Sequence, residues 1–297
     1  EMDEAVMDEE SIAPERRDDW REVQNYVRAM NTAIEELAIL PLSLRLLRHT
    51  HEILMTGVRG DRKTAGEFRH SQNWIGGASL SDAAFIPPHH EDMPGLLSDL
   101  EAFWHNENLQ VPHLVRCALS HYQFETIHPF LDGNGRIGRL LITLYLVSHG
   151  LLHKPSLYLS AHLEKHCGAY YDALTRVRES NDLGHWVRFF LQAVSETSES
   201  GKRTFQRILA LRQELDREVV KLGRRAENAR RLIVYLYGTP AVTVNKAMEL
   251  LGIKYVPANS LIAALAEMGI LEEVTGYQRN RIFILRRYID VFRIENG

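Results

Sequence analysis

The 297-residue sequence contains only two cysteines, Cys117 and Cys167, and neither has a partner at metal-ligand spacing. A disulfide framework and a cysteine-rich zinc site are therefore excluded, and free thiols in a reducing cytoplasm are expected. Long apolar runs are also missing, because the longest apolar-rich stretch, 140–147, is far shorter than the ~20 residues of a membrane-spanning helix. The acidic beginning lacks the apolar core of a signal peptide, so neither export nor a membrane partner is expected.

Charge is abundant but unevenly distributed. The net charge is −4, yet residues 201–297 hold 17 Lys and Arg against 10 Asp and Glu, so they carry +7 and residues 1–200 carry −11. The 45% hydrophobic and 25% charged content is that of an ordinary globular protein. An acidic N-terminal part and a basic C-terminal part indicate two modules with different partners.

Hydrophobic periodicity predicts a mostly α fold. Apolar residues recur at helical spacing, which predicts helices at 20–40, 42–56, 94–106, 112–127, 135–149, 158–166, 168–180 and 184–199. Residues 61–90 lack this period and contain a Gly-Gly and a Pro-Pro pair. We expect an irregular, functional segment there with a short β-hairpin near 73–86.

The pattern changes after a strongly charged helix expected at 201–225. Three short helices are predicted at 229–237, 244–251 and 257–268, followed by two strands at 270–274 and 281–285. Three helices and a two-stranded wing are typical of a winged helix-turn-helix.

A polar loop joins two of the apolar helices. Residues 128–139 read HPFLDGNGRIGR. A buried polar loop is unfavourable unless its groups are used. Gly133 and Gly135 allow a tight turn and a close approach to a ligand. The loop also opens a helix, and the N–H groups at a helix N-terminus form an anion site.

Charged side chains complete this anion site. Arg136 and Arg139 lie three residues apart, so we expect them on one face of the first turn as two guanidinium clamps for phosphate. Asp132 is the kind of carboxylate that holds Mg²⁺ on nucleotide phosphates. His128, at the end of the preceding helix, can take the proton of an attacking hydroxyl.

The same segment resembles the signature of the Fic family, His-x-Phe-x-(Asp/Glu)-Gly-Asn-Gly-Arg-x-x-Arg, and meets every fixed position of it. The resemblance implies a Fic-type helical bundle with a small β-hairpin flap. It also implies a protein adenylyltransferase, which transfers AMP from Mg-ATP, with ATP as co-substrate, to a Ser, Thr or Tyr hydroxyl of a target protein or of itself. Homodimers are common in the family.

The resemblance gives each polar position of the loop a role. His128 is the general base, Asp132 holds Mg²⁺, and Asn134 with the loop N–H groups of Gly133 and Gly135 fixes the α-phosphate. The remaining positions are Arg136 and Arg139, which bind the β/γ end of the nucleotide, and Phe130, which is expected to pack in the core.

The resemblance continues into residues 66–77 and 85–88, where Fic proteins carry a flap that pairs with the target peptide. The flap is expected between Ile75 and Ile86, and its target-facing residues are Ile75, Gly76, Gly77, Phe85 and Ile86. A surface loop without a binding role is the alternative.

Tyr170 and Tyr171 lie where the family often lines the adenine site, although two core aromatics on an amphipathic helix are an equal alternative. Many members also carry an inhibitory motif, (Ser/Thr)-x-x-x-Glu-(Gly/Asn), and this sequence has no match to it. Either such a motif lies upstream of Glu1, or regulation comes from elsewhere.

The predicted domains are an acidic segment at 1–19, the Fic catalytic domain at 20–200, a charged linking helix at 201–228 and the winged helix at 229–297. The partner of the winged helix is either DNA or another protein. If it is DNA, the candidate phosphate contacts are Lys254, Arg279 and Arg281, and the candidate base contacts are Asn259 and Ser260.

Two alternatives to adenylyl transfer remain. One is a Fic enzyme that transfers UMP, phosphocholine or phosphate, and the other is a nucleotide-sensing, DNA-binding regulator. Gly135 and the unaltered signature favour nucleotidyl transfer, and His128 disfavours a pure sensor, which needs no base.

Overall fold

The computed structural model describes residues 16–57, 64–276 and 280–293. The chain divides into two compact units, residues 14–199 and residues 200–297, and the boundary falls within helix α8 (Leu183–Val219). Most of the expected acidic segment and the wing residue Arg279 lie outside the described residues.

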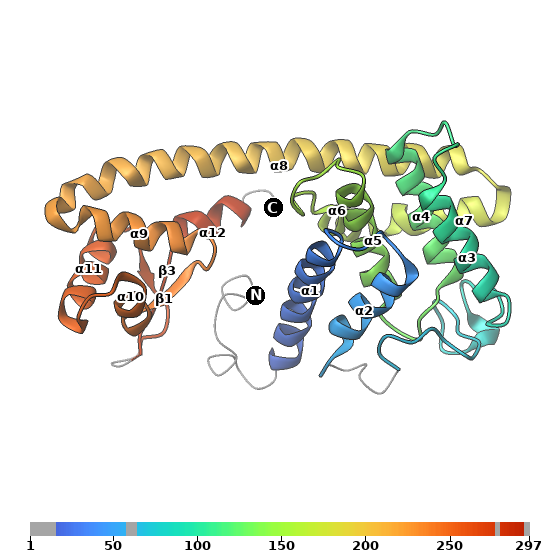
Figure 1. Ribbon diagram of the computed structural model, residues 1–297, viewed down its shortest axis with the longest axis horizontal. Helices are drawn as coiled ribbons and strands as arrows, with labels where there is room; N and C mark the ends of the chain where they lie inside the picture. Colours follow the sequence, from blue (N-terminus) through green and yellow to red (C-terminus); the bar gives the residue numbers. More distant parts are fainter. Residues whose placement is uncertain (1–15, 58–63, 277–279, 294–297) are drawn as a thin grey trace. The chain divides into compact units, whose positions relative to one another are not determined.

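The larger unit is built from helices, as the sequence predicts. Ser43 caps α2 by accepting a hydrogen bond from the Leu46 N–H at 3.3 Å, and Pro112 immediately precedes α4. Before α8 the helices are α1 (Arg17–Glu36), α2 (Leu44–Met55), α3 (Met93–His105), α4 (His113–Ile127), α5 (Asn134–Ser148), α6 (Leu159–Lys165) and α7 (Cys167–Ser180) (Figure 1).

Helices α4 and α5 form the centre of this unit. Side chains along both are fully buried, among them Phe124, Ile137, Leu140 and Leu144, and Trp186 of α8 packs with them. The loop 128–133 connects the end of α4 to the start of α5, and both of these helix ends are buried. The core therefore fixes the position of the polar loop.

Residues 64–92 contain little regular structure. One antiparallel bridge joins Ile75 to Phe85, and a single turn of 3-10 helix, η3 (Leu80–Asp82), lies between them. Gly76 and Gly77 adopt φ angles of 71° and 73°, which glycine accepts without strain. The predicted hairpin is thus a loop closed by one bridge.

The smaller unit contains more structure than the sequence predicts. A three-stranded antiparallel sheet has the order β1-β3-β2. Strand β1 was not predicted, because three residues are too few to show alternation, and helix α12 was not predicted either. The elements after α8 are η4 (Val220–Arg225), α9 (Ala226–Leu236), β1 (Ala241–Thr243), α10 (Val244–Leu251), α11 (Tyr255–Glu267), β2 (Glu272–Glu273), β3 (Ile282–Ile284) and α12 (Arg286–Arg293).

Three expectations about single elements are settled by the structure. The helices predicted at 184–199 and 201–225 are one continuous helix as far as Val219, so Gly201 does not end it. Both cysteines are free thiols, as expected, and Cys117 is buried whereas Cys167 is exposed. None of the described helices combines the length and hydrophobicity of a membrane span.

Candidate active site

The loop between α4 and α5 is held in shape by its own asparagine. The Phe130 N–H donates to Asn134 Oδ1 at 2.8 Å, and Asn134 Nδ2 donates to the Phe130 carbonyl at 2.7 Å. Asn134 is only 2% exposed, so this reciprocal pair is shielded from water. Both polar atoms of the Asn134 side chain therefore bond to Phe130. Only the backbone N–H of Asn134 remains for the predicted contact with phosphate.

His51 of α2 ties the loop to a second segment. Its Nε2 lies 3.0 Å from the Asp132 carbonyl, and its Nδ1 lies 2.9 Å from the Gly66 N–H. The carbonyl can only accept and the N–H can only donate, so His51 is neutral with the proton on Nε2. Its ring stacks on Phe130 at 3.8 Å, and Phe130 is fully buried, as predicted.

Gly133 packs closely against His51 and Met55. Its φ is 75°, and a Cβ atom there would lie 3.1 Å from Met55 Sδ and 3.3 Å from His51 Nε2. Both the backbone angle and the available space therefore require glycine at this position.

Arg69 joins the flap segment to the end of α4. The side chain is 1% exposed. Its Nε donates to the His128 carbonyl at 3.0 Å and one terminal nitrogen donates to the Ile127 carbonyl at 3.3 Å. The same guanidinium also donates to the carbonyls of Ser71 and Pro88, at 3.0 and 2.6 Å. A buried cation at the carbonyl end of a helix is favoured by the helix dipole.

His128 caps α4 in the left-handed conformation, with φ 50° and ψ 61°. Its Nδ1 is buried without a hydrogen-bond partner among the described residues, and the residue as a whole is partly buried. Burial lowers the pKa of the imidazole to about 4, while the Glu125 carbonyl opposes the shift. The ring is therefore neutral near pH 7 and can accept a proton.

The two arginines of α5 have different surroundings. Arg136 lies 3.3 Å from the Glu22 carboxylate of α1 and 4.0 Å from Asp132 Oδ1, so it is already paired. Arg139 has no hydrogen-bond or ion-pair partner within residues 16–57, 64–276 and 280–293. Its charge acts on the buried carboxyl of Glu125, yet its N–H groups make no hydrogen bond in this part of the chain, so they can donate to an anionic ligand.

The first turn of α5 adds further donors to this place. Among the described side chains none caps it. Its N–H groups and the nearby Arg139 therefore form a positive site that an anionic ligand can satisfy. A Cβ on Gly135 would lie 3.3 Å from the Arg139 guanidinium, so glycine keeps this approach open.

Asp132 lies at the edge of the same site. Its side chain is 37% exposed, and Oδ1 accepts the Gly133 N–H at 2.7 Å. A partly exposed carboxylate beside an anion site fits Mg²⁺, which binds proteins through one or two carboxylates plus phosphate oxygens.

A buried polar cluster lies behind the loop, between α4, α5 and α7. His121 Nδ1 donates to the Gly138 carbonyl at 2.8 Å, and the Tyr170 hydroxyl then donates to His121 Nε2 at 2.9 Å. Glu125 is 6% exposed, and its buried Oε1 has no partner among the described residues. A Cβ on Gly138 would lie 2.2 Å from that oxygen, so Gly138 makes room for the carboxyl.

Glu125 should make the stability of this unit depend on pH. Burial raises the pKa of its carboxyl from 4.5 to about 7, and Arg139 and Arg178 oppose the shift. Because the folded state binds this proton more tightly than the unfolded state, the protonated carboxyl stabilises the fold. This contribution is full below pH 4.5 and is lost as the pH rises through 7. The difference in the free energy of unfolding between Glu125→Gln and wild type should therefore shift in favour of the variant by about 2 kcal/mol from pH 5 to pH 8.

Urea unfolding followed by tryptophan fluorescence measures this difference. All 4 tryptophans lie within residues 14–199, so the signal reports on the larger unit alone. Glu35→Gln, at an exposed carboxyl on α1, controls for the substitution itself. A stability difference between Glu125→Gln and wild type that stays the same at pH 5 and pH 8 would contradict the assignment.

The predicted flap residues surround the bridge between Ile75 and Phe85. The Arg178 guanidinium of α7 lies 3.6 Å above the Phe85 ring and so attaches this loop to the helix core. Gly76 and Gly77 form the turn, and Ile86 is 51% exposed. The loop is thus fixed at its base, and Ile86 offers apolar surface.

The two predicted adenine-site tyrosines are placed differently. Tyr170 is 7% exposed, bonded to His121 and packed against Trp186. This is the core-aromatic alternative. Tyr171 is 57% exposed beside it.

The structure brings together every predicted residue of the 128–139 loop, and it adds five that the sequence analysis missed. These residues hold or surround the loop from other elements: Glu22, His51, Arg69, Glu125 and Arg178. Only Glu125 had a signal in the sequence, since it lies one helical turn before His128 on the same predicted helix.

Part of the chain is similar to known proteins. Residues 41–146 match the model of the Fic/DOC family. The chain is 34% identical over 157 residues to the protein adenylyltransferase Fic of Culex quinquefasciatus, covering 52% of this chain and 28% of that protein. The corresponding protein of Aedes aegypti is 32% identical over 160 residues, covering 54% and 27%. The chain thus spans little more than a quarter of the length of these relatives.

A solved structure is similar over almost the whole chain. The crystal structure of a Fic family protein from Desulfovibrio desulfuricans G20 superposes with a TM-score of 0.54 at 23% identity, covering 96% of this chain and 82% of that one. At this identity the likeness concerns the fold.

Proposed function

Because the chain carries a Fic/DOC family domain at residues 41–146, we propose that it is a protein adenylyltransferase, which moves AMP from Mg-ATP to a Ser, Thr or Tyr hydroxyl of a target protein. One observation carries the proposal. His128, neutral and partly buried, lies on the same short loop as an uncapped helix N-terminus, and the half-buried Arg139 follows on the first turns of that helix.

The residues act by positioning and by charge. The target oxygen bonds to the α-phosphorus, the bond to the oxygen that bridges to the β-phosphate breaks, and pyrophosphate leaves. His128 Nε2 takes the hydroxyl proton. The N–H groups of Gly135 and its neighbours bind the α-phosphate, and Arg139 with Arg136 binds the departing end.

Asp132 would hold Mg²⁺ on the nucleotide phosphates, where the cation offsets negative charge. The loop 75–86 would hold the target peptide, with Ile86 as an apolar contact. Tyr171 is the more accessible of the two tyrosines for an adenine ring. The target is another protein or a second copy of the chain.

Labelled nucleotide tests the proposal directly. We would incubate the purified chain with Mg²⁺ and ATP labelled on the α-phosphate, and separately on the γ-phosphate, with cell lysate as a source of targets. We expect protein-bound label only from the α-position, together with a mass gain of one AMP on the modified protein.

Other outcomes distinguish the alternatives. Label from the γ-position alone would identify phosphate transfer. No label from ATP, UTP, CTP or GTP would overturn the proposal and favour the nucleotide-sensing regulator.

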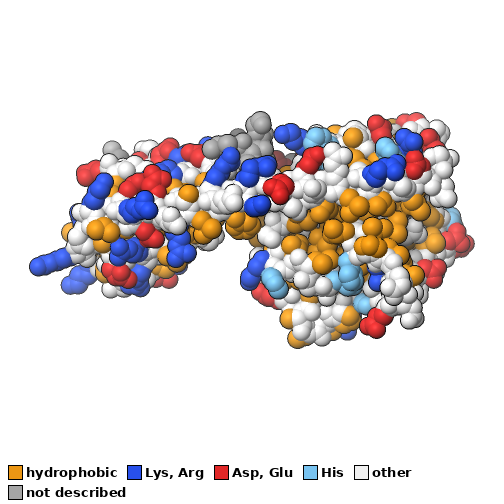
Figure 2. Space-filling model, turned by 90° about the horizontal axis from the view of Figure 1, so that it is seen from above, with side chains coloured by type: hydrophobic (Ala, Val, Ile, Leu, Met, Phe, Trp, Pro, Cys, Tyr) orange, Lys and Arg blue, Asp and Glu red, His pale blue; other side chains and the backbone are white. Residues whose placement is uncertain are grey.

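We further propose that residues 229–297 form a winged helix that docks onto protein rather than DNA. The Arg225 guanidinium donates to the Ser260 hydroxyl at 3.1 Å, and Arg281 lies 5.3 Å from the Phe283 ring centroid, so two predicted DNA contacts are engaged within the unit. On the face seen in Figure 2, Lys and Arg are interspersed with Asp and Glu. Tight, salt-sensitive binding to duplex DNA would contradict this preference.

A further inference from the structure

We propose that His162, His166 and Glu196 form a binding site for a transition-metal ion of the Zn²⁺ type, separate from the nucleotide site. His162 lies on α6, His166 directly follows α6, and Glu196 lies on α8, so the donors come from two helices of the larger unit. One donor atom from each residue lies within 4.8 Å of the other two.

The geometry is close to that of a bound ion. His162 and His166 are four residues apart, so their rings lie on the same side of the chain, with centroids 4.4 Å apart. His162 Nδ1 lies 3.8 Å from Glu196 Oε2. Ligand atoms around a tetrahedral zinc ion are separated by about 3.4 Å. Small rotations of the exposed His166 and Glu196 side chains would therefore close the site.

A neighbouring side chain orients one of the donors. Gln192 Nε2 donates to Glu196 Oε1 at 2.8 Å, which orients the carboxylate as outer residues do in metal sites. Two nitrogens and one oxygen favour Zn²⁺, Co²⁺ or Ni²⁺ over Mg²⁺.

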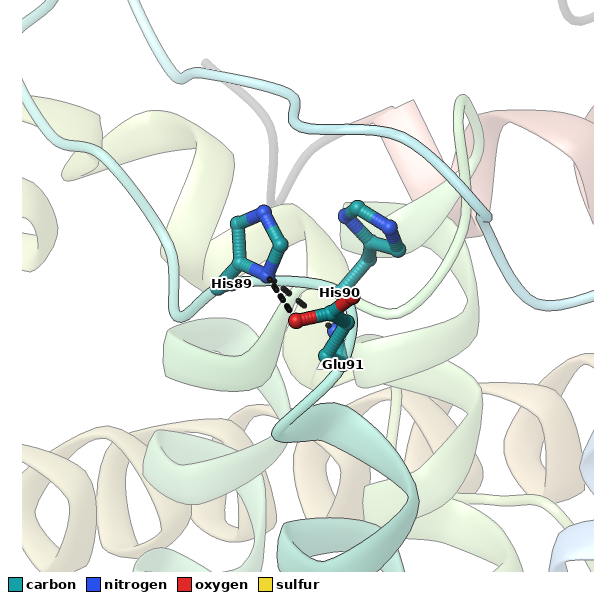
Figure 3. A group of neighbouring side chains, drawn as sticks. All are labelled: His89, His90 and Glu91. Carbon is teal, nitrogen blue, oxygen red and sulfur yellow. Dashed lines mark hydrogen bonds and ion pairs between the residues drawn. The ribbon is translucent and has the colours of Figure 1, made fainter.

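A second histidine cluster provides the natural control. His89, His90 and Glu91 also lie within 4.8 Å of one another, but they are consecutive residues of one loop before α3 (Figure 3). The Glu91 N–H lies 3.4 Å from His89 Nδ1, which directs that lone pair to the backbone. His90 is partly buried whereas His89 and Glu91 are exposed, and three consecutive residues of one turn cannot join two helices as His162, His166 and Glu196 can.

Calorimetric titration of the untagged full chain with Zn²⁺ in excess Mg²⁺ tests the site. The exposed Cys167 thiol is adjacent to His166 and can bind zinc itself, so every measurement uses the Cys167→Ser background. We expect His166→Ala to weaken the strongest zinc site at least ~10-fold and His89→Ala to leave it unchanged.

Two further readouts separate a metal site from a folding defect. Zn²⁺ should slow amide hydrogen exchange in residues 159–166, because it joins α6 to α8, and His166→Ala should abolish this protection. Co²⁺ should give a visible absorption band that His166→Ala removes. Equal zinc affinity in the parent and His166→Ala, or loss of the strongest site in His89→Ala, would overturn the proposal.

Discussion

His128→Ala should lower the rate of AMP transfer about 1,000-fold, because a positioned general base contributes roughly 10²- to 10⁴-fold to such a step. The initial rate of label transfer from the α-phosphate of ATP measures this loss. ATP binding should change only a few-fold, since the anion site consists of the α5 N-terminus and Arg139 rather than the imidazole. Thermal stability should change little, because alanine takes the same left-handed backbone angle as histidine.

The matched control is His153→Ala, at an exposed histidine in the segment between α5 and α6. Its transfer rate should equal that of the wild type. If His128→Ala kept more than a tenth of the wild-type rate, another group would have to accept the proton, and the assigned role would be wrong.

Arg69→Met should remove about 3–5 kcal/mol from the stability of the larger unit, because four carbonyls lose a buried, charged donor. Methionine fills a similar volume without any donor. Two of the four carbonyls belong to Ile127 and His128, so the transfer rate should fall as well. Urea unfolding followed by tryptophan fluorescence gives the first effect, and α-phosphate labelling gives the second.

Arg48→Met serves as the comparison. Arg48 is exposed and donates once, to the Gly66 carbonyl at 2.8 Å. Its loss should change stability by at most about 1 kcal/mol. Similar losses for the two variants would show that the bonds of Arg69 are not individually important. The stability of Arg69→Lys should lie between those of Arg69→Met and wild type, since an ammonium group cannot make all the hydrogen bonds of a planar guanidinium.

The candidate site on the loop between α4 and α5 could be predicted from sequence because its polar residues lie close together in the chain. His128, Asp132 and Arg139 are close together whatever the rest of the fold does. The helices were predicted for a similar reason, since their periodicity is local.

The supports of the loop could not be predicted in this way. Arg69 and His128 are 59 residues apart in the chain, and His51 and Asp132 are 81 apart. A single sequence gives no sign that such residues meet. Asn134 shows the same limit within the loop, because its type was consistent with a phosphate contact, whereas its actual bonds go to Phe130.

The left-handed backbone of His128 has one more consequence. Glycine adopts a φ of 50° without steric conflict, whereas a side chain raises the energy by roughly 1 kcal/mol. A sequence optimised for thermostability alone would therefore favour glycine at this position. If His128 is the general base, stability and activity make opposite demands on this one residue, so stabilising designs should keep position 128 fixed.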